Sequence, residues 1–453
     1  MSAIYILFIV LAGVSLLLLM VLRFRLSAFI ALLITSIFVG ILAGMPLSSI
    51  TTSIQNGMGS TLGFIATVVG LGAIFGQMLE SSGGARTLAD YLLKKFGVKR
   101  SSWALMLTGF IVGIPIFLDI GLIILVPVVY ALTRNSGKSI LYYGIPLLAG
   151  LAVTHAMVPP TPGPTAVAQI LGVDLGWVVL FGLIAGLPTA VIAGPLFGSF
   201  IAKKIKIDVP DILFEARPEK ENEATSKPLF GTVVFLIGLP LILIITATFV
   251  NLGIEKQTFN KSLLTDIIVF TGHPFTALII ATLLSIFVCL RHNFTSQEVL
   301  TLSTKALGPA GIIILVTGAG GVLKQVLIDS GIGKILAESV AGSSFPLILL
   351  AWIIAALVRI TQGSATVAMI TSAGIIAPMV KTFSLSQPHI ALVVIAIASG
   401  ATIMSHVNDS GFWIVSKYLG MNEKQTLKSW TVMETIIAVS GLVITLIISL
   451  LFN

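Results

Sequence analysis

The chain has 453 residues, of which 56% are hydrophobic and only 10% are charged, and its mean hydropathy is +1.08. Soluble domains carry about 25% charged residues, so this composition excludes a soluble globular fold, because too much apolar surface would face water. The net charge of +8 does not indicate a nucleic-acid partner, since no basic stripe is interleaved with aromatic residues. Apolar runs long enough to cross a bilayer recur along the whole chain, which predicts an all-α polytopic membrane protein.

The apolar segments, taken in chain order, predict continuous spans and two interrupted stretches. The continuous spans cover residues 3–21, 26–44, 61–79, 141–172, 176–202, 230–251, 275–290, 308–327, 388–416 and 430–451. The interrupted stretches are 103–133 and 345–380. The apolar N-terminal segment is interpreted as the first membrane helix and not as a cleaved signal peptide, because no small-residue cleavage site follows it.

The positions of Lys and Arg predict the orientation. If Arg23 and Arg25 are cytoplasmic, most of the 26 basic residues are cytoplasmic too, and so is the polar linker 203–227. The loop 80–102 is then inside, whereas 45–60, which has no Lys or Arg, and both termini are outside. This scheme holds only if the interrupted stretches are re-entrant hairpins, at about 103–138 and 345–382, that return to the side from which they came.

An internal repeat relates the two halves of the chain. Its shared residues are Gly70, Gly72, Gln77, Leu79, Ser82, Gly83, Leu88 and Ala89, which recur about 250 positions later as Gly318, Gly320, Gln325, Leu327, Ser330, Gly331, Leu336 and Ala337. His155 likewise recurs as His406. The repeats are 1–202 and 228–453, each with about five spans and one hairpin, and an odd number of spans inverts the second repeat relative to the first. Inverted repeats with broken helices are typical of secondary transporters, whose sites lie at mid-membrane between the repeats; a duplicated scaffold without transport is the alternative.

The helical pattern is interrupted at membrane depth in four places. These are 113–121 in the first hairpin, 154–165 in the broken helix 141–172, 359–366 in the second hairpin, and 405–411 in the broken helix 388–416. Four prolines between 159 and 164 cannot all stay in an α-helix, and the freed backbone groups need partners in protein or in a wet cavity. Residues 158–164 are therefore expected to line a cavity. Helix N-termini at such breaks suit a carboxylate ligand.

These interruptions supply the candidate site. Ionisable residues in apolar surroundings mark ion or substrate paths, and Arg359 can clamp a carboxylate through its planar fork. The predicted substrate-binding residues are Asp119, Thr161, Gly163, Thr165, Arg359, Gly363, Ser364, Thr366, Asn408 and Ser410. The predicted proton-coupling residues are His155, His406, Asp119 and Asp409, because histidine and desolvated carboxylates titrate in the useful range. A structural buried ion pair is the alternative for any one of these residues.

Other charged residues have simpler interpretations. Glu434 is interpreted as a helix cap, and Lys324 and Glu80 as span-end residues that reach the interface. Enzyme functions are disfavoured, since the chain has no H-E-x-x-H, G-x-S-x-G or P-loop motif. An intramembrane protease, using Ser364 with a histidine or Asp119 with Asp409, is the best enzymatic alternative. A channel is the remaining alternative, but it would show a continuous polar stripe, whereas the polar groups here cluster at mid-membrane. No cofactor or metal is expected.

At these residues the chain resembles the gluconate:proton symporter family of the ion-transporter superfamily. The most specific stretches are THAMVPPTPGPT from Thr154, RITQGSATVA from Arg359 and SHVNDSGFW from Ser405, joined by KQVLIDSG from Lys324 and KSWTVMET from Lys428. The resemblance runs from Arg23 to the C-terminus. It implies two inverted repeats with re-entrant hairpins and proton-driven uptake of gluconate or a related sugar acid across the cytoplasmic membrane.

One position departs from the family pattern. Many gluconate carriers have a histidine where this chain has Thr161, which removes one candidate proton group and leaves D-serine or a shorter hydroxy acid as alternative substrates. The expected partners are a small organic anion, protons and the lipid bilayer. The sequence leaves open whether protons or sodium drive transport, whether the chain forms a homo-oligomer, and whether the mechanism is elevator-like or rocking.

Overall fold

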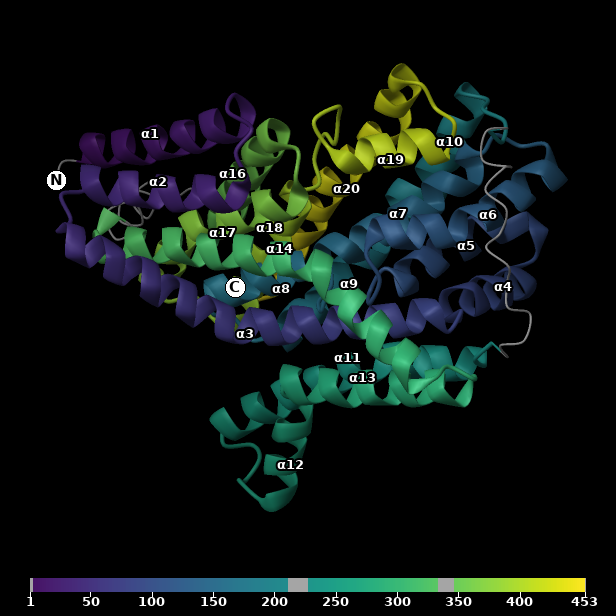
Figure 1. Cartoon of the computed structure of the whole chain (residues 1–453), viewed down its shortest axis with the longest axis horizontal. Helices are drawn as coiled ribbons and strands as arrows, with labels where there is room; N and C mark the ends of the chain where they lie inside the picture. The colour runs from purple at the N-terminus through teal and green to yellow at the C-terminus, as the bar shows by residue number, and fades with distance from the viewer. Residues whose placement is uncertain (1–2, 211–226, 333–345, 453) are drawn as a thin grey trace.

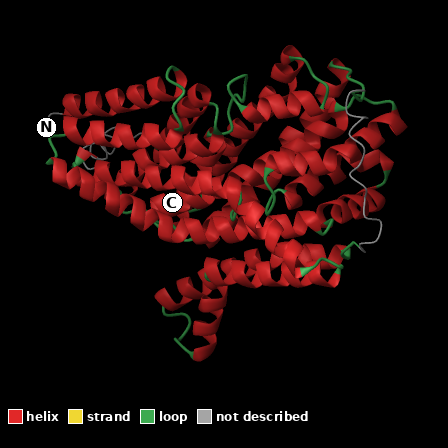
Figure 2. Ribbon diagram, in the orientation of Figure 1, coloured by secondary structure: helices red, strands yellow, loops and turns green. Residues whose placement is uncertain are grey.

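The structure is a computed structural model that describes residues 3–210, 227–332 and 346–452. The regular elements of these residues are all helices (Figure 2), and most of them lie side by side as long rods (Figure 1). Nine described helices are long and apolar enough to cross a membrane, judged by length and composition. The predicted all-α polytopic membrane protein is therefore confirmed.

The helices of the first half precede the linker. They are α1 (Ala3–Leu22), α2 (Ala28–Leu42), α3 (Leu47–Ser81), α4 (Gly84–Phe96), η1 (Val98–Arg100), α5 (Ser101–Val112), α6 (Leu118–Ser136), α7 (Leu141–Met157), α8 (Pro162–Leu171), α9 (Leu175–Val191), η2 (Ile192–Leu196) and α10 (Phe197–Lys204).

The helices of the second half follow the linker, of which residues 211–226 lie outside the described residues. They are α11 (Phe230–Glu255), α12 (Leu263–Gly272), α13 (Pro274–Arg291), α14 (Ser296–Asp329), α16 (Leu347–Gln362), α17 (Ala365–Thr382), α18 (Gln387–Gly400), α19 (Ser410–Tyr418) and α20 (Glu423–Ser449). The repeated positions Leu336 and Ala337 also lie outside the described residues.

Two helices are longer than the sequence predicted. α3 has 35 residues and α14 has 34, whereas the predicted spans were 61–79 and 308–327. Most of the segment 45–60, which was predicted to lie outside the membrane between two spans, belongs to α3. Its hydroxyl side chains bond back to the helix itself: Thr51 and Thr52 both donate to the Ser48 carbonyl. Such bonds hide hydroxyl polarity inside a helix, so hydropathy alone underestimates its length.

α3 and α14 run antiparallel in close contact (Figure 1). Ser53 Oγ donates to Asp329 Oδ2 at 2.6 Å, and an added Cβ at Gly57 would stand 2.7 Å from the Gly321 carbonyl oxygen. Further along, Gly70 faces Leu307. Residue numbers thus rise along one helix as they fall along the other, and the missing side chain at Gly57 lets the two backbones approach.

Each of the four predicted interruptions breaks a helix. α5 and α6 are separated at 113–117, α7 and α8 at 158–161, α16 and α17 at 363–364, and α18 and α19 at 401–409. The prolines account for the first two breaks, since Pro115 and the pair Pro159 and Pro160 lie within them. That each hairpin returns to its own side of the membrane stays a prediction.

The most deeply buried helices carry breaks at their C-terminal ends. In α7 almost every residue is buried, and in α18 every residue from Ile390 to Gly400 is buried. This arrangement puts the broken ends of α7 and α18 in the interior of the protein.

The segment 80–102, predicted to lie on the cytoplasmic side, contains α4, whose residues Ala85, Leu88 and Ala89 are fully buried. Its side of the membrane stays a prediction.

Candidate functional site

A cavity of about 550 Å³ lies among the broken helices, within the range of about 300–1,000 Å³ that is usual for small-molecule sites. We call it the central cavity. Its lining residues come from α6, α7, α14, α16, α17, α19, α20 and the segment before α19. The predicted site residues among them are Asp119, His155, Arg359, Gly363, Ser364, Thr366, Asn408, Asp409 and Ser410. The structure therefore brings most of the predicted site together.

Three helix N-termini meet at this cavity. The first turns of α6, α17 and α19 line it through Leu118, Thr366 and Ser410. Helix N-termini carry partial positive charge and unpaired N–H groups, which favour anions. The Ser364 side chain accepts from Val367 N at 3.4 Å and caps α17, so this hydroxyl is already engaged by its own helix.

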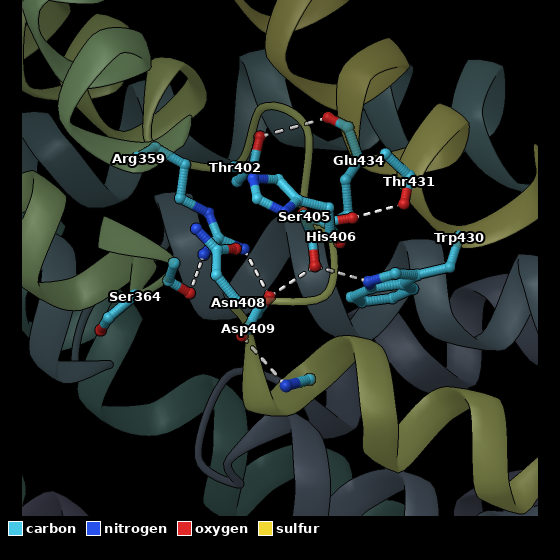
Figure 3. A network of polar contacts seen from close by, with 12 residues as sticks. Arg359, Ser364, Thr402, Ser405, His406, Asn408, Asp409, Trp430, Thr431 and Glu434 are labelled. Atoms are coloured by element: carbon cyan, nitrogen blue, oxygen red, sulfur yellow. Dashed lines mark hydrogen bonds and ion pairs between the residues drawn. The ribbon is translucent and has the colours of Figure 1, made fainter. Parts of the chain in front are cut away.

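Arg359 and Asp409 form an ion pair at the edge of the cavity (Figure 3). Nη2 of Arg359 lies 2.5 Å from Oδ2 of Asp409, and the two side chains are only 3% and 13% exposed. Nη1 of Arg359 donates to the Gly363 carbonyl, while its buried Nε has no hydrogen-bond partner. The structural ion pair and the substrate-binding interpretation of Arg359 thus both have support. Protein groups hold its guanidinium, and its Nε donor is still unused.

The Asp409 carboxylate anchors a wider network (Figure 3). Its Oδ2 also accepts from Ser405 Oγ at 2.5 Å, and Ser405 Oγ accepts from Trp430 Nε1 at 2.7 Å. Its Oδ1 accepts from Gly411 N at 3.0 Å and caps α19. Asp409 therefore ties α16, α19 and α20 together at one carboxylate.

The turn between α16 and α17 is also fastened to the segment before α19. Ile360 O accepts from Asn408 Nδ2 at 3.0 Å and contacts His406 Nε2 at 3.0 Å. Gly363 has φ +78, and an added Cβ there would stand 2.3 Å from the Asn408 carbonyl oxygen. Only glycine fits this left-handed position beside another backbone, so the two segments form one unit.

Two further titratable residues face the cavity from the first half of the chain. Asp119 is exposed in the first turn of α6. His155 lies near the end of α7, and its ring packs edge-on against Phe117 with centroids 6.0 Å apart. Its Nδ1 is buried and has no hydrogen-bond partner. These residues bring the first half to the same site as the Arg359–Asp409 pair.

Four predicted residues do not line the central cavity. They are Thr161, Gly163, Thr165 and His406. The Thr161 hydroxyl donates to Val158 O at 2.6 Å and the Thr165 hydroxyl to Thr161 O at 2.7 Å, so both are satisfied locally. Residues 158–164 were expected to line a cavity, and Pro160, Thr161 and Pro162 among them line a small cleft beside Gly72 and Pro115.

Glu434 and Gln362 are among the lining residues that sequence reasoning missed. The interpretation of Glu434 as a helix cap is wrong, because α20 begins at Glu423 and is capped by Asn422. Glu434 lies inside that helix, is 4% exposed and lines the central cavity. Its Oε1 has no hydrogen-bond partner, and neither does the side-chain amide of Gln362. The available signal was a carboxylate within the apolar run 430–451.

Comparison with known proteins places the chain in a family. Residues 5–451 match the model for GntP family permeases. The chain is 40% identical to the gluconate permease of Pseudomonas aeruginosa over 435 residues, covering 96% of this chain and 95% of that protein. It is 40% identical to the low-affinity gluconate transporter of Escherichia coli K12 over 440 residues, or 96% of each chain. It is also 38% identical to the Gnt-II system L-idonate transporter of Escherichia coli K12 over 437 residues, covering 96% of this chain and 97% of that protein.

The fold also has a solved counterpart. The crystal structure of the YdaH transporter of Alcanivorax borkumensis matches with a TM-score of 0.64 at 14% identity, covering 93% of this chain and 98% of that one. At this identity the likeness concerns the fold alone. The family match confirms the predicted resemblance and the prediction of a multi-pass transporter in place of an enzyme. This chain belongs to the GntP permease family.

Proposed function

We propose that this permease takes up gluconate or a related sugar acid together with protons across the plasma membrane. The observation that carries the proposal is the central cavity, in which three helix N-termini and the Arg359 side chain line space for a small anion. A carboxylate suits these donors. Similar chains named for gluconate or L-idonate support a sugar acid as the substrate.

The polyhydroxyl chain of a sugar acid also has partners in the cavity. Gln362 offers buried amide atoms that no protein group uses, and the exposed side chains of Asn408 and Ser410 line the same space. Asp119 adds a carboxylate that can accept hydroxyl hydrogens. A short acid would leave several of these groups without partners, which favours the longer substrate.

The proposal includes two inverted repeats, 1–202 and 228–453, and an elevator-like or rocking motion. α3 and α14 support it, because they run antiparallel and are followed by Gly83 and Gly331 at φ 78 and 73. Each half also has two broken helices, in the same order along the chain. Transport then proceeds by alternating access around the central cavity, with the hairpins at about 103–138 and 345–382 closing over the anion.

Uptake into proteoliposomes tests the function. Labelled gluconate is presented with and without an imposed inward proton gradient, and with a sodium gradient as the matched control. Accumulation above equilibrium only with the proton gradient is the expected result. Unlabelled L-idonate, D-serine and short hydroxy acids serve as competitors, and a ranking led by D-serine or a short acid would replace the sugar acid as substrate. Absence of transport of every anion by inserted protein would contradict the proposal.

A further inference from the structure

Glu434 occupies an unusual place for a carboxylate. It lies on α20, 4% exposed, in the wall of the central cavity. Its Oε1 is buried without a hydrogen-bond partner. An ionised carboxylate in that position loses its hydration without gaining donors, and this costs far more than burying the neutral acid. The local structure therefore favours a bound proton at Glu434 whenever the cavity is closed to water.

The net charge of the cavity also favours a protonated carboxylate. Its charged side chains are Asp119, Asp409, Glu434 and the single cation Arg359, with His155 as a further titratable group. With the histidine neutral and all carboxylates ionised, negative charges exceed positive ones before any substrate is bound. A proton on one of these carboxylates lowers the excess of negative over positive charge and so weakens the repulsion of an entering anion. Binding of the anion and binding of a proton are thereby linked.

The two other carboxylates of the cavity lining are already hydrogen-bonded or open to water. Asp409 pairs with Arg359 and also accepts from Ser405 and Gly411, so protonation there would break an established network. Asp119 is exposed and keeps its hydration. Two histidines are further titratable groups in this region: His406 contacts Ile360 O, and His155 faces the cavity from α7.

We propose that Glu434 is the residue that carries the cotransported proton. The inference rests on the proposed proton-coupled uptake and identifies its proton site. On the entry side, a carboxylate oxygen of Glu434 takes one proton from water and an O–H bond forms. The neutral side chain lets the substrate anion bind beside Arg359. On the exit side the anion leaves, the O–H bond breaks and the proton passes to water.

The position of Glu434 also connects its protonation to the ion pair. Glu434 lines the same cavity as Arg359 and Asp409, and Trp430, one turn earlier on α20, bonds Ser405 in the Asp409 network. Thr402 Oγ1 donates to the Glu434 carbonyl at 3.4 Å, which fastens the same turn of α20 to the broken end of α18 (Figure 3). A change of charge at Glu434 is thus felt at Arg359, the proposed contact of the substrate carboxylate.

Glu434→Gln tests the inference, because glutamine keeps the shape of the protonated acid and cannot release a proton. The control is Glu423→Gln, an exposed carboxylate at the start of the same helix. Full-length protein in proteoliposomes is assayed for gluconate exchange without a gradient and for accumulation driven by a proton gradient. Glu434→Gln is expected to keep exchange within about threefold of the wild type and to lose accumulation, whereas Glu423→Gln keeps both.

If Glu434→Gln exchanges gluconate too slowly for a rate to be measured, a second measurement tests the same inference. Gluconate binding is followed by calorimetry in two buffers of different ionisation enthalpy. The wild type and Glu423→Gln are expected to take up about one proton on binding, and Glu434→Gln none. Accumulation by Glu434→Gln at the wild-type level, proton uptake that persists in this variant, or loss of its gluconate binding would overturn the inference. Wild-type protein that transports gluconate without responding to the proton gradient would overturn the proposed coupling itself.

Discussion

Trp430 on α20 donates a 2.7 Å hydrogen bond from Nε1 to the hydroxyl of Ser405, which lies between α18 and α19. The same hydroxyl donates to Asp409, the partner of Arg359. One indole N–H therefore links the last long helix of the chain to the buried ion pair. Because the chain of donors ends on a charged group, each bond orients the next, and the position of Asp409 depends on Trp430.

Replacing Trp430 with Phe tests this link. Phenylalanine keeps an aromatic ring, although a smaller one, and lacks the N–H donor; a neutral hydrogen bond contributes about 1 kcal/mol. We expect the initial rate of gluconate uptake to fall about fivefold, with the same amount of protein in the membrane. Trp103→Phe is the control, because Trp103 is 39% exposed on α5, and its uptake should be unchanged. Equal rates in both variants would show that Asp409 does not depend on the indole.

Arg359→Ala is expected to abolish uptake. It removes the proposed contact of the substrate carboxylate and leaves the Asp409 carboxylate largely buried without its cation, at a cost of about 3–5 kcal/mol. Lost stability and lost substrate contact are separated by the double variant Arg359→Gln with Asp409→Asn. This neutral pair should recover the thermal melting point measured in detergent but not uptake. Near-normal uptake by either variant would remove Arg359 from the site.

Gly363→Ala should destabilise the protein more than a comparable change elsewhere. Left-handed backbone costs a residue with Cβ about 1–2 kcal/mol, and here the added Cβ would also stand 2.3 Å from the Asn408 carbonyl oxygen. Gly137→Ala is the matched control, since Gly137 has φ 66 and nothing within 4 Å of its added Cβ. Thermal melting should show the larger loss for Gly363→Ala, and equal losses would mean that the contact with Asn408 can relax.

Asp119→Asn tests the contribution of the first half to the cavity. The carboxylate lines the cavity from the first turn of α6, and hydrogen bonds to a charged group contribute about 1.5–3 kcal/mol. We expect uptake to fall at least about tenfold while the amount of membrane protein stays constant. A normal rate would exclude Asp119 from substrate binding and from proton coupling alike.

Much of the architecture could be predicted from sequence, because apolar runs and prolines report local properties. The breaks at Pro115, at Pro159 and Pro160, and at Gly363 all occur where the helical pattern is interrupted. The start of α3 could not be found in this way, since its hydroxyl groups bond within the helix and a hydropathy profile counts them as polar. Helix length there depends on packing against α14, which a local pattern does not contain.

Site residues could be predicted where the residue type itself implies a function. They could not be predicted where the fold determines which partners a side chain meets. Arg359 and Asp409 stand out as charges in apolar surroundings, and the structure pairs them. Thr161 shares a long motif with residues near the site, yet its hydroxyl is used by Val158 O. Glu434 was misread because a carboxylate near an expected helix start resembles a cap. Because α20 begins at Glu423, before the apolar run, Glu434 lies inside the helix and not at its start.

Substrate protection at Ser410 tests most directly whether the central cavity holds the substrate. The chain has one cysteine, Cys289, which is buried, so a Ser410→Cys variant offers a single accessible thiol at an exposed position of the cavity lining. Alkylation by N-ethylmaleimide is followed with and without gluconate, and Ser262→Cys, at an exposed position before α12, is the control. We predict that gluconate slows alkylation at 410 in proportion to its occupancy and leaves 262 unchanged. Equal alkylation at 410 with saturating gluconate, in protein that transports it, would contradict a substrate site in the central cavity.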